Sequence, residues 1–268
     1  MQTDEALHYL EQAMELYRQL GERRYQAIAI NALGFLNLIR GNLAVSENLI
    51  KESIHLLQEI KDRALLPYAL LRWGDLHLEQ GRYAEAERIY YEAFDICKNV
   101  HLIGGQKAAL KRLGELYYMQ RKYRLARRVF KEACELSNLQ GTETPPPIER
   151  AWYALLNGSL DEAESILIQH CRWMKEHRAF SDICYILELF ALILEKRKLF
   201  SHSIKILKFS LSIRKKYQIN KNIKYIKMKI ARLNSLISTR SIENASQSIS
   251  PDTLGFIDEI EAIAACLI

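Results

Sequence analysis

The side chains of this sequence that could do chemistry are few and widely spaced. The five cysteines include no Cys-x-x-Cys pair, so the sequence predicts neither a disulfide framework nor a structural zinc site. They are Cys97, Cys134, Cys171, Cys184 and Cys266. The one cluster of metal-ligating residue types is His170, Cys171 and His177. Its two histidines lie seven residues apart, about two helical turns, which is too far for both to hold one metal ion. We predict no metal site.

Motifs of catalysis are also missing from the sequence. It contains no glycine-rich phosphate-binding loop, no His-Glu-x-x-His and no Gly-x-Ser-x-Gly. Its carboxylates are mostly interspersed with lysine and arginine, as on the solvated face of a helix. The sequence therefore predicts no catalytic residue, no cofactor and no enzymatic activity, which leaves binding as the class of function.

The composition favours a soluble chain made of helices. Only 11 glycines and 5 prolines occur among 268 residues, which leaves long stretches of good helix formers. The longest apolar run, at 189–194, is far shorter than the roughly 20 residues that cross a bilayer. The first residues lack the basic and apolar regions of a secretory signal. We therefore expect a cytoplasmic protein without a membrane span.

A repeat of 40 residues organises the first half of the chain. The segments at 31–53, 72–94 and 111–133 align with one another. Four sets of residues recur at this interval, which are Gly34, Gly74 and Gly114, then Ser46, Ala86 and Ala126, then Ile50, Tyr90 and Phe130, and last Ser53, Ala93 and Ala133. Periods of 20–50 residues are typical of solenoids, so this periodicity decides the predicted fold.

The physical meaning of the repeat is a pair of helices. A glycine in the first helix, such as Gly74, lets the second helix approach closely, which offsets the ~1 kcal/mol that glycine costs in a helix. A turn follows at Gly81, where a left-handed residue is easiest to place. In the second helix the small residues Ala86 and Ala93 flank the large Tyr90, as close antiparallel packing requires. We expect Gly74→Leu to overpack this contact and Gly74→Ala to be mild or neutral.

The pattern resembles the tetratricopeptide repeat (TPR), with Leu-Gly in the first helix, glycine at the turn, and Ala…Phe/Tyr…Ala in the second helix. The 40-residue period, longer than the common one of roughly 34, is similar to the TPR arrays of bacterial signal-transduction ATPases, of helix-turn-helix TPR regulators that sense peptides, and of some eukaryotic adaptors. The resemblance implies an all-α, right-handed solenoid of about five helix pairs with terminal capping helices.

Weaker units extend the repeat in both directions. One unit at 151–170 keeps the turn glycine but has Ala151 at the first-helix position, and the next, at 190–210, keeps only the spacing of Ala191 and Ser203. Residues 4–21 fit a second helix alone. The repeat at the N-terminus is therefore a half repeat, with a second helix only. Either its helix serves as its own cap, or the chain is the C-terminal part of a longer protein.

The resemblance also implies a binding groove, because the first helices of TPR arrays line the concave face. The positions carried over from the family combine apolar and polar side chains, as suits a peptide or a partner helix. They are Asn31, Phe35, Leu38, Tyr68, Leu71, Asp75, Leu78, Lys111, Glu115, Tyr118 and Trp152. Inter-repeat packing is the alternative role for each of them. The carboxylate clamp of chaperone-binding TPR proteins does not map, because Asp75 and Ala108 stand where it needs lysine or asparagine.

The chain outside the repeats divides by composition. We expect TPR repeats at 1–140, a Pro-rich loop at 141–147, degenerate repeats with a basic capping helix at 148–238, a Ser-rich linker at 239–251 and an acidic, apolar tail at 252–268. The Pro-rich loop is either a hinge or a long connection between repeats. The tail is either a loose terminus or a segment that docks intramolecularly, on the last repeats or in the nearby groove.

The charge distribution adds one more candidate surface. Residues 196–232 contain 13 lysines and arginines and no acidic residue. This stretch is either the solvated face of a capping helix or a surface for an acidic partner, a nucleic acid or an anionic membrane. The sequence thus predicts a non-catalytic module that binds a protein or a peptide, as the sensor or interaction part of a regulatory protein. A pure scaffold in a protein complex and a nucleic-acid-associated regulator that uses the basic region are the alternatives.

Overall fold

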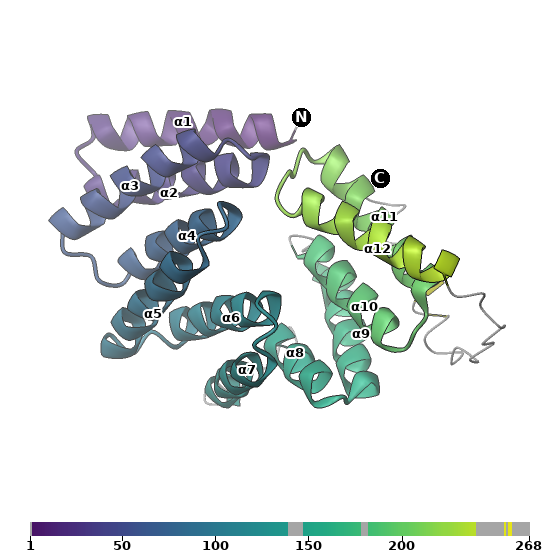
Figure 1. Ribbon diagram of the computed structural model, residues 1–268. Coiled ribbons are helices and arrows are strands. Elements are labelled where there is room, and N and C mark those ends of the chain that lie inside the picture. The colour runs from purple at the N-terminus through teal and green to yellow at the C-terminus, as the bar shows by residue number, and fades with distance from the viewer. Residues whose placement is uncertain (1, 139–146, 178–181, 240–254, 256, 259–268) are drawn as a thin grey trace. The chain divides into compact units, whose positions relative to one another are not determined.

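The structure, a computed structural model, describes residues 2–138, 147–177, 182–239, 255, 257 and 258. Among these residues the regular secondary structure is entirely α-helical and forms twelve helices (Figure 1). The chain divides into two compact units, Met1–Gly141 and Thr142–Ile268. Five helix pairs with a single helix before and after them confirm the predicted all-α, TPR-like solenoid.

The first unit contains seven helices that stack in chain order, each against the next (Figure 1). They are α1 (Gln2–Gln19), α2 (Arg23–Arg40), α3 (Leu43–Glu59), α4 (Leu66–Glu79), α5 (Tyr83–Asn99), α6 (Ile103–Met119) and α7 (Tyr123–Asn138). The pairs α2/α3, α4/α5 and α6/α7 correspond to the three in-register repeats. Helix α1 corresponds to a second helix, as the position of the half repeat predicts.

The second unit contains five helices and follows the same alternation. They are α8 (Ile148–Asn157), α9 (Leu160–His177), α10 (Ile183–Lys196), α11 (Phe200–Lys216) and α12 (Ile223–Thr239). Helices α8 and α10 are first helices, α9 and α11 are their partners, and α12 follows as a single helix against α11. None of the helices among the described residues is long and apolar enough to cross a membrane.

The helices end at a constant interval. In the first unit a residue with positive φ occurs every 20 residues, at Gly21, Gly41, Lys61, Gly81, His101 and Arg121. At each of these positions two backbone N–H groups return to the carbonyl groups of the last turn, as at Gly81 and Arg82, which donate to Leu78 and His77 at 3.0 and 2.9 Å. This is the Schellman arrangement, and it ends both helices of a repeat in the same way.

The repeat glycines lie where the two helices of a pair cross. A Cβ atom added to Gly74 would stand 2.3 Å from Cε1 of Tyr90, and one added to Gly114 would stand 2.5 Å from Cζ of Phe130. The aromatic rings therefore occupy the space that a side chain on the first helix would need. The crossing predicted from the sequence is confirmed, but Gly74→Ala cannot be neutral, because even a methyl group meets a buried ring.

In two helix pairs a serine of the second helix forms a hydrogen bond to the first helix where the two helices cross. In the first repeat Ser46 Oγ donates a hydrogen bond of 2.8 Å to the carbonyl of Gly34. In the last pair Ser203 Oγ donates one of the same length to the carbonyl of Ala191. Both serines are fully buried. Their hydroxyls are satisfied by the first helix, so the small polar residue tightens the crossing without leaving an unpaired donor.

Several predicted segments fall mostly outside the described residues. The Pro-rich loop, 141–147, is described only at Pro147, and the linker, 239–251, only at Thr239. In the tail, 252–268, the described residues are Gly255, Ile257 and Asp258, of which Ile257 is 3% exposed. The predicted segment boundaries and the docking of the tail therefore stay predictions.

Replacement of the crossing glycine tests the packing of the repeat. Gly74→Ala should lower the free energy of unfolding by about 1–3 kcal/mol, because the new methyl group must displace the Tyr90 ring. Gly104→Ala is the matched control, since its added Cβ meets nothing within 4 Å. Urea denaturation measures both changes. If Gly74→Ala is no worse than Gly104→Ala, the close crossing is wrong.

At the helix ends with positive φ we predict a substitution that raises the free energy of unfolding. Arg121 has a φ of 61°, a conformation that costs a non-glycine residue about 1–2 kcal/mol. Arg121→Gly should therefore raise the free energy of unfolding by about 1 kcal/mol. Arg127→Gly, an exposed position inside α7, should lower it by a similar amount. Equal effects of the two substitutions would contradict the Schellman end at Arg121.

Candidate protein-binding surface

The candidate surface is the layer formed by helices α2, α4 and α6. Helix α4 contacts both α2 and α6, so the first helices of the three repeats lie side by side. We call these three helices the first-helix layer. The second helices α3, α5 and α7 each pack on the first helix of their own pair. The layer therefore exposes the side of each first helix that is turned away from its partner.

The predicted groove residues differ in how far they reach the surface. Tyr68 is 38% exposed. Six others are half-buried, namely Asn31, Phe35, Leu78, Lys111, Glu115 and Tyr118. Three are buried in the first unit, namely Leu38, Leu71 and Asp75, at 1–3% exposure. Trp152 belongs to the second unit, is 7% exposed, and donates its indole N–H to the Tyr185 hydroxyl. The seven accessible positions are those that a ligand could reach without rearrangement.

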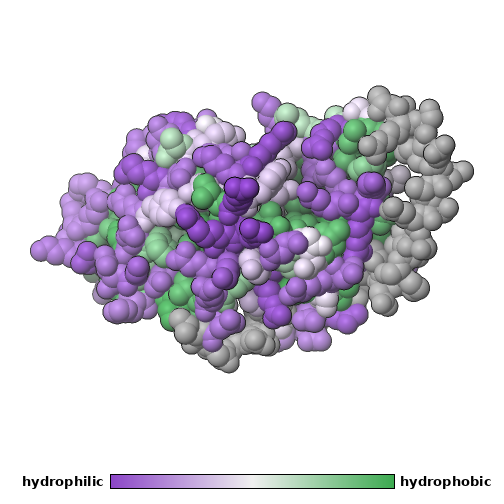
Figure 2. Space-filling model, turned by 60° about the horizontal axis from the view of Figure 1, so that its bottom comes forward, coloured by the Kyte–Doolittle hydropathy of each residue, from purple (hydrophilic) through white to green (hydrophobic). Residues whose placement is uncertain are grey.

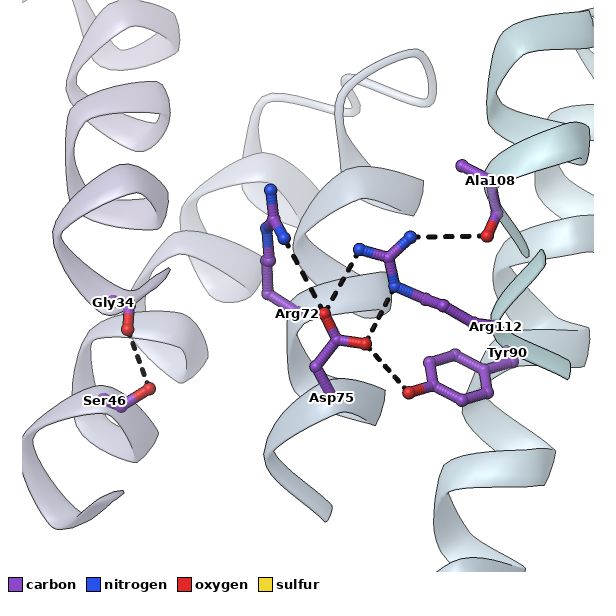
Figure 3. Close-up of polar contacts among 7 residues, drawn as sticks. All are labelled: Gly34, Ser46, Arg72, Asp75, Tyr90, Ala108 and Arg112. Atoms are coloured by element: carbon purple, nitrogen blue, oxygen red, sulfur yellow. Dashed lines mark hydrogen bonds and ion pairs between the residues drawn. The ribbon is translucent and has the colours of Figure 1, made fainter. Parts of the chain in front are cut away.

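Asp75 is the centre of a buried polar cluster in this layer (Figure 3). Its Oδ1 accepts hydrogen bonds from the Tyr90 hydroxyl at 2.9 Å and from Nε of Arg112 at 2.8 Å. Its Oδ2 accepts one from Nη2 of Arg112 at 3.2 Å and lies 3.7 Å from Nη1 of Arg72. Arg112 also donates to the carbonyl of Ala108 at 3.3 Å. One carboxylate thus joins α4 to its own partner helix and to the next repeat.

The cluster contains two cations and one anion. Asp75 raises the pKa of Arg112 above its ordinary value, although burial alone would lower it. The charged form of Arg72 is less favoured. Burial, and to a smaller extent the positive charge of Arg112, lower the pKa of Arg72 to about 10. Burial and the nearby Asp75 raise the pKa of Tyr90 well above its ordinary value, so its hydroxyl stays protonated and donates. Arg72 is therefore a charged group at neutral pH, and its side chain is 29% exposed.

The two arginines repeat one geometry. Arg112 contacts the residue 37 positions before it, Asp75, and Arg72 contacts the residue 37 positions before it, Phe35. The guanidinium carbon of Arg72 lies 3.5 Å from the centroid of the Phe35 ring. Each arginine thus reaches from its own repeat to the first helix of the preceding repeat. An ion pair serves one junction and a cation–π contact the other.

Exposed apolar side chains lie among polar ones on the surface of the protein. Figure 2 shows one face of the molecule, on which hydrophobic residues appear between hydrophilic ones. Large apolar side chains with more than a third of their area exposed include Tyr68 and Met119 on the first-helix layer and Tyr83 and Tyr123 at the start of second helices. Accessible aromatic side chains beside methionine and arginine are the residue types enriched at protein-binding surfaces.

The histidine and cysteine cluster of α9 lies partly in the interior and partly at the surface. His170 and Cys171 are buried, whereas His177 is exposed and stacks on Trp173 with ring centroids 4.5 Å apart. Within the part of the chain that the structure describes, no group of three His, Cys, Asp or Glu residues could hold a metal ion. These side chains pack in and on α9.

Arg72 and Arg112, which join neighbouring first helices of the layer, are not among the residues predicted from the sequence. Arg72 and Arg112 occur at the same position of consecutive repeats, two residues before the crossing glycine. That 40-residue spacing was visible, and it was the one available signal. The contacts that join the repeats, Arg112 to Asp75 and Arg72 to Phe35, each span 37 residues, so no motif within a single helix reveals them.

Comparisons with known proteins agree with this fold. Residues 66–138, helices α4 to α7, match the family model of the tetratricopeptide repeat. This match identifies tetratricopeptide repeats in that part of the chain. No curated protein matched the sequence. Among solved structures, the crystal structure of BtubC (BKLC) from P. vanneervenii is similar, with a TM-score of 0.55 and 16% sequence identity over 93% of this chain and 97% of that chain. At this identity the similarity shows the fold alone.

Removal of the Asp75 charge tests the buried cluster. Asp75→Asn keeps the shape of the side chain but leaves two neighbouring arginines without their anion, so the free energy of unfolding should fall by about 3 kcal/mol. Asp95→Asn, on the exposed side of α5, should change it by less than about 0.5 kcal/mol. Urea denaturation of both variants gives the comparison. A wild-type stability for Asp75→Asn would mean that the arginines do not depend on it.

Proposed function

We propose that the chain is a non-catalytic TPR module that binds a protein or a peptide on the first-helix layer. TPR repeats generally mediate protein–protein interaction, and stacked repeats offer extended surfaces for it. The observation that carries the proposal is the contrast within the layer. Asp75 is buried and accepts hydrogen bonds from the buried Tyr90 of α5 and from the half-buried Arg112. Tyr68, Phe35 and Arg72 keep part of their side chains exposed.

The chemistry of the accessible side chains suits a partner that is both apolar and polar. Tyrosine and arginine are enriched among residues that dominate binding energies. A support held by ion pairs reduces the side-chain entropy that binding would otherwise cost, since Arg72 is fixed between Phe35 and Asp75. We infer a peptide or an exposed helix of a partner protein as the ligand, with a cytoplasmic regulator as the setting and a sensor role for this chain.

The basic region gives weaker support for the nucleic-acid alternative. Several of its cations are already engaged within the second unit. Arg214 donates to Glu188, and Lys229 and Arg232 both contact Glu195 at 3.2 and 3.3 Å. Arg197 contacts Glu164. Fewer cations therefore remain for phosphate groups than the sequence predicts.

Site-specific crosslinking tests where the partner binds. A photo-reactive residue placed at Lys111, in the first-helix layer, should capture a partner from the native cell, and one placed at the exposed Lys131 of α7 should not. The captured protein then supplies the ligand for affinity measurements. Equal capture from both positions would contradict the assignment of the surface.

Substitution of an accessible tyrosine tests the same surface quantitatively. Tyr68→Ala should weaken binding of that partner by about 2 kcal/mol, roughly 30-fold, while the helical spectrum stays native. Tyr83→Ala is the matched control, because Tyr83 is similarly exposed, at 42%, but lies on α5 outside the layer. Isothermal titration measures both. If Tyr83→Ala weakens binding as much as Tyr68→Ala, the partner does not use the first-helix layer.

A further inference from the structure

Helix α1 carries an uncovered apolar stripe. Tyr9, Leu16 and Leu20 are 68%, 53% and 63% exposed, and together with Ala13 they lie on one face of the helix because of their spacing. The residues 40 positions later are better covered, with Leu56 at 8% and Ser53 at 0% exposure. The same face of a second helix is therefore buried in the next repeat and open on α1.

The neighbour that covers this face in the next repeat is the first helix of the pair. Ser53 Oγ donates a hydrogen bond of 2.9 Å to the carbonyl of Ala27 on α2. Leu56 belongs to a core cluster with Ala27 and Ile30 of the same helix. The structure thus shows what fits the open stripe of α1, namely a first helix with a small residue at the crossing.

Helix α12 exposes the face with which a first helix contacts its second helix. Ala231 stands 40 residues after Ala191, at the crossing position of a first helix. Ala191 is fully buried against α11, where Ser203 bonds its carbonyl, but Ala231 is exposed. Met228 and Tyr225 on α12 are 63% and 48% exposed. Helix α12 buries Ile226 and Leu233 on its other side, so the face that would receive a second helix is open.

The two open helices also carry opposite charge. Helix α1 has four acidic residues and one arginine, a net charge of −3. Helix α12 has three lysines, one arginine and no acidic residue, a net charge of +4. Asp4 and Glu15 already contact Arg40 and Arg18, and Lys229 and Arg232 already contact Glu195. Exposed charges remain on the open faces of both helices, namely Glu5 on α1, one turn before Tyr9, and Lys224 and Lys227 on α12, one to two turns before Ala231.

We propose that α12 of one copy packs on α1 of a second copy and completes a helix pair between them. The exposed face of α12 and the exposed stripe of α1 then form the same crossing as the pairs inside the chain, with Ala231 over Leu10. Lysines on the open face of α12 place their charges beside the acidic α1, and their aliphatic stems cover Tyr9 and Leu16. The contact is heterologous, so further copies can add at both ends unless a ring closes.

Sedimentation of the full chain over the micromolar range tests this association. The wild-type protein should form dimers and larger species, and higher salt should weaken them because the two helices attract through exposed charges. Leu16→Glu blocks the α1 face and Ala231→Arg blocks the α12 face, each at an exposed position that leaves the fold intact. Each variant alone should raise the dissociation constant by about tenfold or more. Val45→Glu, equally exposed on α3, should have no effect.

A mixture of the two blocked variants separates this contact from other modes of association. One variant retains an open α12 and the other an open α1, so their mixture should form a 1:1 dimer and nothing larger. Association through two α1 helices would leave Ala231→Arg oligomeric and the mixture no larger than its parts, which would overturn the proposal. A wild-type chain that stays monomeric at the highest concentration would overturn it as well.

Discussion

The structure depends on the close crossing of two helices at a residue without a side chain. Gly74 and Gly114 leave room for Tyr90 and Phe130, whose rings fill the space above the first helix. Everything else in a repeat follows from this crossing. It sets the distance between the two helix axes. It therefore also sets which side of the first helix remains available to solvent and to the next repeat.

The polar cluster at Asp75 builds on that crossing. Tyr90 covers Gly74 with its ring and donates to Asp75 with its hydroxyl, so one side chain serves both the pair and the junction. Arg112 then attaches the next repeat to the same carboxylate. Desolvation of the carboxylate and of the two guanidinium groups offsets much of the Coulombic gain, although removal of the carboxylate alone leaves both cations uncompensated. The first-helix layer is thereby held as one surface.

The sequence was sufficient for the fold because its signals are local and recur. Each crossing glycine precedes its large partner by 16 residues, and that pair of residue types appears three times in register. The helix ends at Lys61, His101 and Arg121 were not predictable in the same way, since nothing in these side chains favours positive φ. Their conformation is imposed by packing of the helices on either side.

The candidate surface was predictable only in outline. In the first unit, family positions fall on the first helices α2, α4 and α6, but they placed Leu38 and Leu71 among the groove residues, and both side chains are buried. A helix that packs on its partner and on two neighbouring first helices buries more than one stripe, and periodicity within one helix cannot separate them. Asp75 is buried for a further reason, namely that its cation comes from a helix 37 residues later.

The regular spacing of the helix ends also constrains how this chain can change in length. In the first unit a residue with positive φ follows every 20 positions, so both helices of a pair have the same length between their turns. A single residue inserted within a helix would rotate all that follows by about 100°, and would turn the crossing glycine away from its ring. Gain or loss of a whole 40-residue block preserves every face. Duplication of a whole repeat therefore leaves the packing of the helices unchanged, whereas insertion of one residue is tolerated only in the turns between helices.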